Sequence, residues 1–230
     1  MASAISGLAA VSDTLASLCP NRGLAVDCGS GVGDAAIQLS GEFVEVAAID
    51  LKAAHLHRTP RAPGVFPICA RAEDLPLADQ SVDLLFTLQS LHHFDIPAFI
   101  KEATRILRPG GIFAALCYGR HKVNSQIDRA CEAFYAAVEP HWEPEYSLVM
   151  SGYAELDLPF QERALPELFM ERRMNRQQFG NYLRSWTASR RFHRRNGYLP
   201  VPRPRASLFG GPAGRIPVRW PILGRVGQRM

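Results

Sequence analysis

Short apolar runs alternate with amphipathic stretches through the first half of the chain. The clearest helical period lies over residues 95–108, where apolar side chains recur every three or four positions. Asp95 can cap the start of this helix and Pro109-Gly110 ends it. Strands that alternate with helices in this way predict an α/β fold around a mostly parallel sheet. The predicted strands are residues 23–28, 43–50, 64–69, 82–88 and 111–118.

The second half of the chain has a weaker pattern. One helix is predicted from Asn124, and another over residues 176–191, whose aromatic side chains at helical spacing we interpret as packed core. Residues 161–172 are predicted to form a sixth strand, and residues 200–212 have loop composition. The buried face of the helix after Asn124 is predicted to contain Ile127, Cys131, Phe134, Tyr135 and Val138.

We predict one domain, because a chain of 230 residues with 47% hydrophobic residues can bury a sizeable core. Its core spans about residues 20–138, and its cap and substrate elements about 139–215. A final strand follows over about 216–226. Residues 141–146 are aromatic and contain proline, which is typical of a loop over a pocket.

A glycine-rich turn follows the first predicted strand, as Asp27-Cys28-Gly29-Ser30-Gly31-Val32-Gly33, and the second strand ends in Asp50. A dinucleotide-binding turn carries glycine at its first, third and sixth positions, but the sixth position here is Asp34. Asp27 would repel a pyrophosphate, whereas it can pair with an ammonium group. The turn therefore predicts a pocket for S-adenosylmethionine, whose amino-acid tail carries an ammonium group, rather than for NAD.

The turn resembles motif I of the class I S-adenosylmethionine-dependent methyltransferases, and the resemblance extends over about residues 23–230. Residues 72–77 and 81–86 resemble the adenine-side loop and fourth strand of that family, and residues 99–113 resemble the helix, turn and fifth strand that follow. The sequence is most similar to the small-molecule branch that includes the trans-aconitate methyltransferases. The segments that carry this similarity are Gln89–Asp95, Phe134-Tyr135, Ser185–Thr187, Val218–Pro221 and Arg225–Gly227.

This resemblance implies a Rossmann-like sheet of seven strands, helices on both faces, and a small cap over the carboxyl edge of the strands. It implies that Asp50 accepts hydrogen bonds from the ribose hydroxyls, that Leu51 covers one face of the adenine, and that the backbone around Gln89 borders the methionine portion. Ala72 and Glu73 would line the edge of the base. The expected cofactor residues are Asp27, Gly29, Gly31, Gly33, Asp50, Leu51, Ala72, Glu73 and Gln89.

His92 and His93 follow the fourth predicted strand, at the edge where such sheets bind ligands. An imidazole with a pKa of ~6.5 can accept a proton from a hydroxyl or an amine, so either can act as a general base. The alternative is that His92 only shapes this loop, since an ionised carboxylate acceptor needs no base. Candidate pocket walls are Trp142, Tyr146, Tyr118 and Trp186, and candidate anion ligands are Arg184 and Arg219.

Positive charge gathers in the last third of the chain. Residues 1–160 carry 11 Lys and Arg against 19 Asp and Glu, whereas residues 161–230 carry 15 arginines against 3 acidic residues. Arginine forms bidentate pairs with carboxylates and phosphates, so this part can favour an anionic substrate, a nucleic acid or the acidic part of the same chain. Pairing within the chain and solvation are the plainer alternative.

Three functions remain open. The first is methyl transfer to a carboxylate or hydroxyl oxygen of a small-molecule metabolite. The second is RNA methylation, which the arginines favour. The third is a ligand-binding protein or cyclase that keeps the cofactor pocket without methylating, which is favoured because the N-terminal Tyr/Arg/Pro segment of the family has no counterpart in this sequence.

Composition limits the remaining classes. The five cysteines form no C-x-x-C pair, and we expect buried free thiols at Cys28, Cys69 and Cys117. His55 and His57 lack partners at metal-ligand spacing and are expected at the surface, so no metal is predicted. No apolar run approaches the ~20 residues of a membrane helix. Residues 1–20 lack the basic start of a signal peptide, so we expect a core-packing helix and a cytoplasmic protein.

Overall fold

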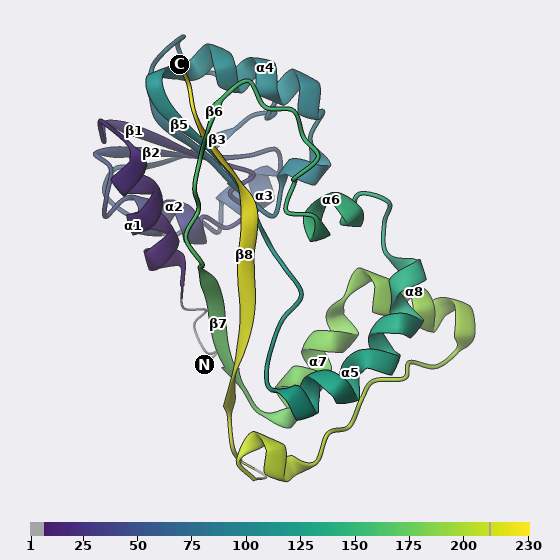
Figure 1. The fold of residues 1–230 in the computed structure, drawn as a ribbon. Helices are drawn as coiled ribbons and strands as arrows, with labels where there is room; N and C mark the ends of the chain where they lie inside the picture. The colour runs from purple at the N-terminus through teal and green to yellow at the C-terminus, as the bar shows by residue number, and fades with distance from the viewer. Residues whose placement is uncertain (1–6, 212) are drawn as a thin grey trace. The chain divides into compact units, whose positions relative to one another are not determined.

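The computed structural model describes residues 7–211 and 213–230, which form two compact units (Figure 1). The sheet unit comprises Gly7–Gly119, Leu148–Leu168 and Ile222–Met230. The described residues of the other, which we call the helical unit, are Arg120–Ser147 and Phe169–Pro221. Each is described by itself, and the organisation as one domain stays a prediction.

The sheet confirms the predicted α/β class. Its strands run in the order β3-β2-β1-β4-β5-β8-β6. The first five strands along the chain pair in parallel, and β8 is antiparallel to both β5 and β6. The strands are β1 (Leu24–Cys28), β2 (Glu45–Asp50), β3 (Val65–Cys69), β4 (Val82–Leu88), β5 (Leu107–Tyr118), β6 (Gln161–Arg163) and β8 (Ile216–Gln228). The five strands predicted first are therefore confirmed.

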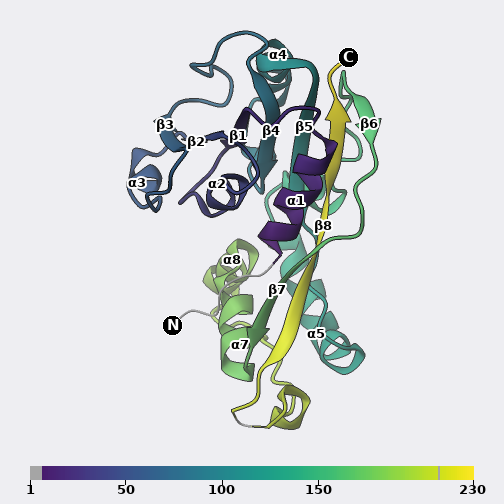
Figure 2. The ribbon, with the colours of Figure 1, turned by 90° about the vertical axis from the view of Figure 1, so that its left-hand side faces the viewer.

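Helices cover both faces of this sheet, as the buried side chains of its central strands require (Figure 2). Helix α4 (Ile96–Ile106) packs on one face against Leu85 and Phe113. Helices α1 (Leu8–Leu18) and α2 (Asp34–Leu39) lie against each other and surround Phe86. Since successive strand residues point to opposite faces, Leu85 and Phe86 mark the two layers. The core-packing first helix is thus confirmed over α1, whereas residues 1–6 lie outside the described residues.

The start of α4 agrees with the sequence, whereas its end is corrected, because the helix ends at Ile106 and Pro109-Gly110 lie within β5. The Asp95 side chain accepts a hydrogen bond from the amide of Ala98 at 3.2 Å, and Pro97 occupies the first turn. A short helix, α3 (Ala53–Leu56), follows β2, and a 3-10 turn, η1 (Leu91–His93), follows β4. The sheet unit also contains the second part of α6 (Tyr146–Met150).

The helical unit contains α5 (Ser125–Val138), in which all five predicted core residues are buried. The Asn124 side chain caps it by accepting a hydrogen bond from the Ile127 amide at 2.9 Å. The other elements are η2 (Glu139–His141), β7 (Phe169–Met174), α7 (Arg176–Ser185), α8 (Thr187–Asn196), η3 (Ala206–Phe209) and the first part of β8, which pairs antiparallel with β7. Apart from η3, the described residues of the predicted loop 200–212 form neither helix nor strand.

Three expectations are corrected. The predicted strand 161–172 is two strands, β6 and β7, since the chain between them contains Pro166, which lacks an amide proton. The predicted helix 176–191 breaks at Trp186, whose φ of −62° and ψ of 142° are extended. Cys69 is exposed because β3 is an outer strand, whereas Cys28 and Cys117 are buried. No helix among the described residues has the length and apolarity needed to cross a membrane.

We expect Phe113→Ala to lower the free energy of unfolding by about 3–5 kcal/mol, because the truncation leaves a cavity in the packed core. Phe113 is buried on β5, and its ring stacks on Phe160 with centroids 4.9 Å apart. The matched control is Phe66→Ala on β3, where the side chain is 50% exposed and the expected loss is below about 1 kcal/mol. Urea unfolding followed by circular dichroism measures both, and equal losses would contradict the central position of β5.

Candidate functional site

A cleft of about 590 Å³ lies in the sheet unit, where the carboxyl ends of β1, β2 and β4 meet. Eight residues singled out in the sequence line it, and these are Gly29, Gly31, Asp50, Leu51, Ala72, Glu73, Gln89 and His93. Asp27, Gly33 and His92 are not among its lining residues. A parallel sheet places ligands at this edge, so the position agrees with the topology.

The glycine turn after β1 lets two loops come close together. Gly29, Gly31 and Gly33 have φ values of 77°, 57° and 83°, in the left-handed region that favours glycine. A Cβ atom on Gly29 would lie 2.5 Å from the Cβ of Ser90, which follows β4. The amides of Gly29 and Ser30 also donate to the carbonyl of Ile49, at 2.7 and 2.9 Å. The turn is therefore fixed against both neighbouring strands.

Asp50 holds the same turn from the end of β2. One carboxylate oxygen accepts from the Gly31 amide at 2.9 Å, and the other accepts from the Lys52 amide at 2.8 Å. The Nδ1 atom of His55 lies 3.3 Å from Asp50 Oδ1. A carboxylate has about four acceptor positions. Asp50 can therefore position the backbone and still accept hydrogen bonds from a hydroxyl ligand.

Asp27 is a buried carboxylate at the start of the glycine turn, with a side chain only 2% exposed. Burial raises the pKa of Asp27 to about 7, and the nearby carboxylates of Asp50 and Asp34 raise it further, while the Ala36 amide lowers it. Its Oδ2 atom has no hydrogen-bond partner. An ionised, partly unpaired carboxylate in this position is costly. A cationic ligand group would relieve that cost.

Glu73 and Gln89 are held at the cleft by the backbone. The Glu73 carboxylate accepts from the Asp95 amide at 2.9 Å and lies 3.3 Å from Arg71. Gln89 has a φ of 58°, which is uncommon for a residue with a side chain, and its amide donates to the carbonyl of Leu116 at 2.9 Å. Strained backbone of this kind gathers at ligand sites.

The two histidines after β4 have different surroundings. The His92 Nδ1 atom lies 3.2 Å from the hydroxyl of Tyr153, a fully buried residue. His93 is exposed and lines the cleft, and the centroids of the two rings are 4.1 Å apart. His92 is therefore anchored to the core, and His93 is the imidazole that a ligand in the cleft can reach.

His121 in the helical unit was not singled out from the sequence. It is 3% exposed, and its Nε2 atom lies 2.9 Å from the hydroxyl of Tyr135. Burial lowers the pKa of His121 to about 4, with a further contribution from Arg120, so the ring is neutral at pH 7. The signal available in the sequence was its place three residues after Tyr118, where β5 ends.

The other candidate residues fall in both units. Trp142 and Tyr146 stack in the helical unit with centroids 3.9 Å apart, and the Trp186 ring lies 5.6 Å from that of Trp142. Tyr118 belongs to the sheet unit, where burial raises its pKa to about 12.

The two candidate anion ligands have different surroundings. The guanidinium of Arg219 pairs with Glu171 at 2.7 Å. Arg184 lines a second pocket in the helical unit. His57 is exposed as expected, His55 is partly buried, and the described residues contain no cluster suited to a metal ion.

Residues 26–115 match a family model described as methyltransferase domain. Among solved structures, a protein of Anaeromyxobacter dehalogenans provisionally described as a type II methyltransferase is 34% identical and superposes with a TM-score of 0.88. The match covers 98% of this chain and 97% of that one.

Two curated relatives match over shorter segments. A provisionally assigned methyltransferase of Dictyostelium discoideum is 25% identical over 170 residues, which make up 72% of this chain and 65% of the relative. A malonyl-(acyl-carrier protein) O-methyltransferase of Dechloromonas aromatica is 32% identical over 112 residues, which make up 47% of this chain and 41% of that protein. The chain thus spans less than two thirds of the length of these two relatives.

We expect Asp27→Asn to stabilise the ligand-free protein at about pH 8. The carboxyl has a pKa of 3.8 when unperturbed and about 7 in the folded protein, so folding takes up a proton between these values. Stability therefore falls as the pH rises through that window, by about 4 kcal/mol in all, and the amide removes this loss.

Urea unfolding between about pH 5 and pH 8 measures this effect. Asp13→Asn is the matched control, because Asp13 is exposed on α1, does not act on the pKa of Asp27, and its loss should change stability little. Identical pH profiles for the wild type and Asp27→Asn would contradict the raised pKa.

Proposed function

The chain belongs to the class I S-adenosylmethionine-dependent methyltransferases, and from this premise we propose that it methylates an oxygen, in a carboxylate or hydroxyl, of a small organic acceptor. The observation that carries the proposal is the buried, partly unpaired carboxylate of Asp27 beside a three-glycine turn. The oxygen is favoured because one relative is named as an O-methyltransferase. Methylation of RNA is the second candidate, supported by the arginines of the helical unit.

The residues of the cleft fit the cofactor. S-adenosylmethionine carries a methyl group activated by a sulfonium, together with an ammonium, a ribose and an adenine. The negative charge of Asp27 next to the cleft would favour the ammonium, and the amides of the glycine turn would approach the carboxylate end. Asp50 would accept from the ribose hydroxyls. Leu51 is a large apolar side chain that is 61% exposed at the cleft, as expected for a residue that covers the adenine.

Ala72, Glu73 and Gln89 complete the proposed cofactor site. Ala72 and Glu73 would line the edge of the adenine, and the backbone at Gln89 would border the methionine portion. Asp27 and Gly33 do not line the cleft themselves, so their proposed contributions are the charge next to it and the conformation of the turn.

His93 is proposed as the general base for a hydroxyl acceptor, and His92 as the residue that positions it. His93 is exposed at the cleft, where it can take the hydroxyl proton on a ring nitrogen. His92 contacts the His93 ring and is anchored by Tyr153. An acceptor that is already an ionised carboxylate would not need this step.

Titration calorimetry with S-adenosylmethionine and S-adenosylhomocysteine tests the site, and mass spectrometry of incubations with small carboxylic acids, hydroxyl compounds and RNA tests the acceptor. We expect both nucleosides to bind, and Asp27→Asn to weaken S-adenosylmethionine by about tenfold or more because the negative charge next to the ammonium is lost. The control variant Asp13→Asn, at an exposed position on α1, should bind normally. Binding without any methylated product would favour the non-methylating alternative, and methylated RNA alone would overturn the small acceptor.

With a hydroxyl acceptor, we expect His93→Ala to lower kcat by about 10²-fold or more while cofactor affinity is unchanged, since only proton transfer is lost. A higher pH should partly restore the rate, because the acceptor then ionises without a base. His57→Ala, an exposed histidine outside the cleft, is the control. Unchanged kcat at saturating hydroxyl acceptor would exclude His93 as the base.

A further inference from the structure

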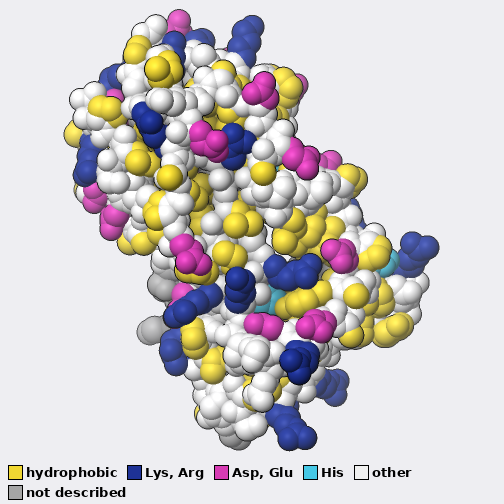
Figure 3. Space-filling model, in the orientation of Figure 1, with side chains coloured by type: hydrophobic (Ala, Val, Ile, Leu, Met, Phe, Trp, Pro, Cys, Tyr) yellow, Lys and Arg dark blue, Asp and Glu magenta, His cyan; other side chains and the backbone are white. Residues whose placement is uncertain are grey.

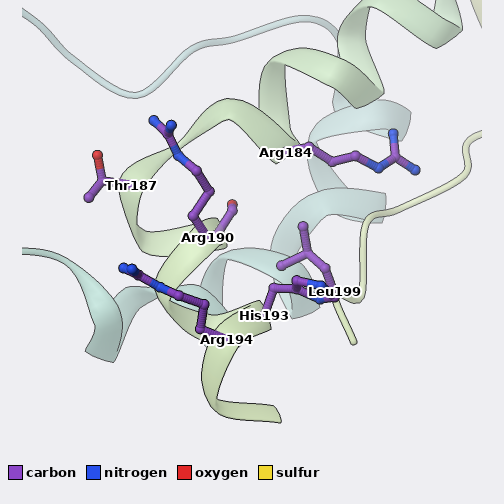
Figure 4. Close-up of a pocket in the computed structure, with 7 residues that line it drawn as sticks. Arg184, Thr187, Arg190, His193, Arg194 and Leu199 are labelled. Carbon is purple, nitrogen blue, oxygen red and sulfur yellow. The ribbon is translucent and has the colours of Figure 1, made fainter. Parts of the chain in front are cut away.

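A second pocket, of about 680 Å³, lies in the helical unit around α8 and the end of α7. Its lining includes Arg184, Arg190, Arg194, Thr187 and Leu199 and, among the described residues, no carboxylate. Figure 4 shows that Thr187, Arg190 and Arg194 extend to the same side of α8, whereas Arg184 points the other way. Two arginines and a threonine hydroxyl therefore extend from one side of α8.

The arginines of α8 are arranged at a cost to the helix. Arg190 and Arg194 are four residues apart, as are Arg191 and Arg195, and like charges at this spacing destabilise a helix. Arg190 lies in the first turn, where the helix dipole disfavours a cation, whereas Arg194 and Arg195 lie in the last turn, where it favours one. Arg191 pairs with Glu143 at 2.6 Å. In the described part of the chain, no carboxylate lies within ion-pair distance of Arg190 or Arg194.

The surroundings do not supply the missing negative charge. The described residues of the helical unit contain 15 Lys and Arg against 6 Asp and Glu. Figure 3 shows Lys and Arg side chains gathered over this unit on the face drawn. The first turn of α8 has no acidic residue, and its N-cap, Trp186, makes no side-chain hydrogen bond to the helix. An anion next to Thr187 would thus lie at a helix start without a side-chain cap, near the positive end of the helix dipole.

We propose that this pocket binds the phosphate group of a small organic phosphate, held by Arg190, Arg194 and the Thr187 hydroxyl. A phosphate offers three acceptor oxygens and close to two charges, which match two guanidinium forks and one hydroxyl better than a single carboxylate does. A concave pocket of this volume suits a small molecule. Binding of single-stranded nucleic acid instead needs a long basic groove with several stacking platforms.

Titration calorimetry with inorganic phosphate and pyrophosphate, at constant ionic strength, tests the proposal. We expect pyrophosphate to bind more tightly than phosphate, and the double variant Arg190→Gln/Arg194→Gln to weaken pyrophosphate by about tenfold or more. Arg195→Gln removes one charge from the same helix but does not line the pocket, and should change the affinity by less than about twofold.

The affinity for S-adenosylhomocysteine, measured in parallel, should be unchanged in all these variants. This control shows that the variants fold, and it separates the phosphate site from the proposed methyl transfer. An equal loss of pyrophosphate binding in Arg195→Gln and in the double variant would overturn the site in favour of general charge attraction. Binding of RNA oligonucleotides that tightens with length and exceeds that of pyrophosphate would overturn the small ligand in favour of a nucleic acid.

Discussion

The close approach of three loops at the carboxyl edge of the sheet is the constraint on which the cleft depends. The turn after β1 can lie against Ser90 only because Gly29 has no Cβ. The Asp50 carboxylate then ties Gly31 to the start of α3 by accepting hydrogen bonds from the amides of Gly31 and Lys52. These contacts turn the ends of separate strands into one set of backbone amides and carboxylates that face a common space.

Charges without partners lie next to the cleft and in the second pocket. Asp27 sits in the core of the sheet unit with an oxygen that lacks a hydrogen bond, and Arg190 and Arg194 repel each other along α8. Neither arrangement stabilises the folded chain by itself. Consistent local choices are the rule in foldable sequences, and the exceptions gather where a ligand supplies the missing interaction. The charges at the two pockets have opposite signs, since the first would bind a cationic group and the second an anionic group.

The contrast in charge follows the division into units. The described residues of the sheet unit carry 11 Lys and Arg against 16 Asp and Glu, while the helical unit carries the excess of arginine. An acidic sheet suits a cofactor with a sulfonium and an ammonium. A basic set of helices suits an anionic acceptor or ligand, because arginine keeps its charge and its planar donors at any physiological pH.

The sequence by itself determined the elements whose signals are local. Five strands, the caps Asp95 and Asn124, and the glycine turn follow from apolar periodicity and from backbone chemistry within a few residues. Only the tertiary structure decided what depends on distant neighbours. The position of β3 at the edge of the sheet exposes Cys69, and packing buries Asp27 in the core of the sheet unit. Packing also encloses His121 among aromatic rings. The tertiary structure also breaks the predicted helix at Trp186 and brings Arg190, Arg194 and Thr187 to one side of α8. Burial and pKa are properties of packing, and no pattern along the chain contains them.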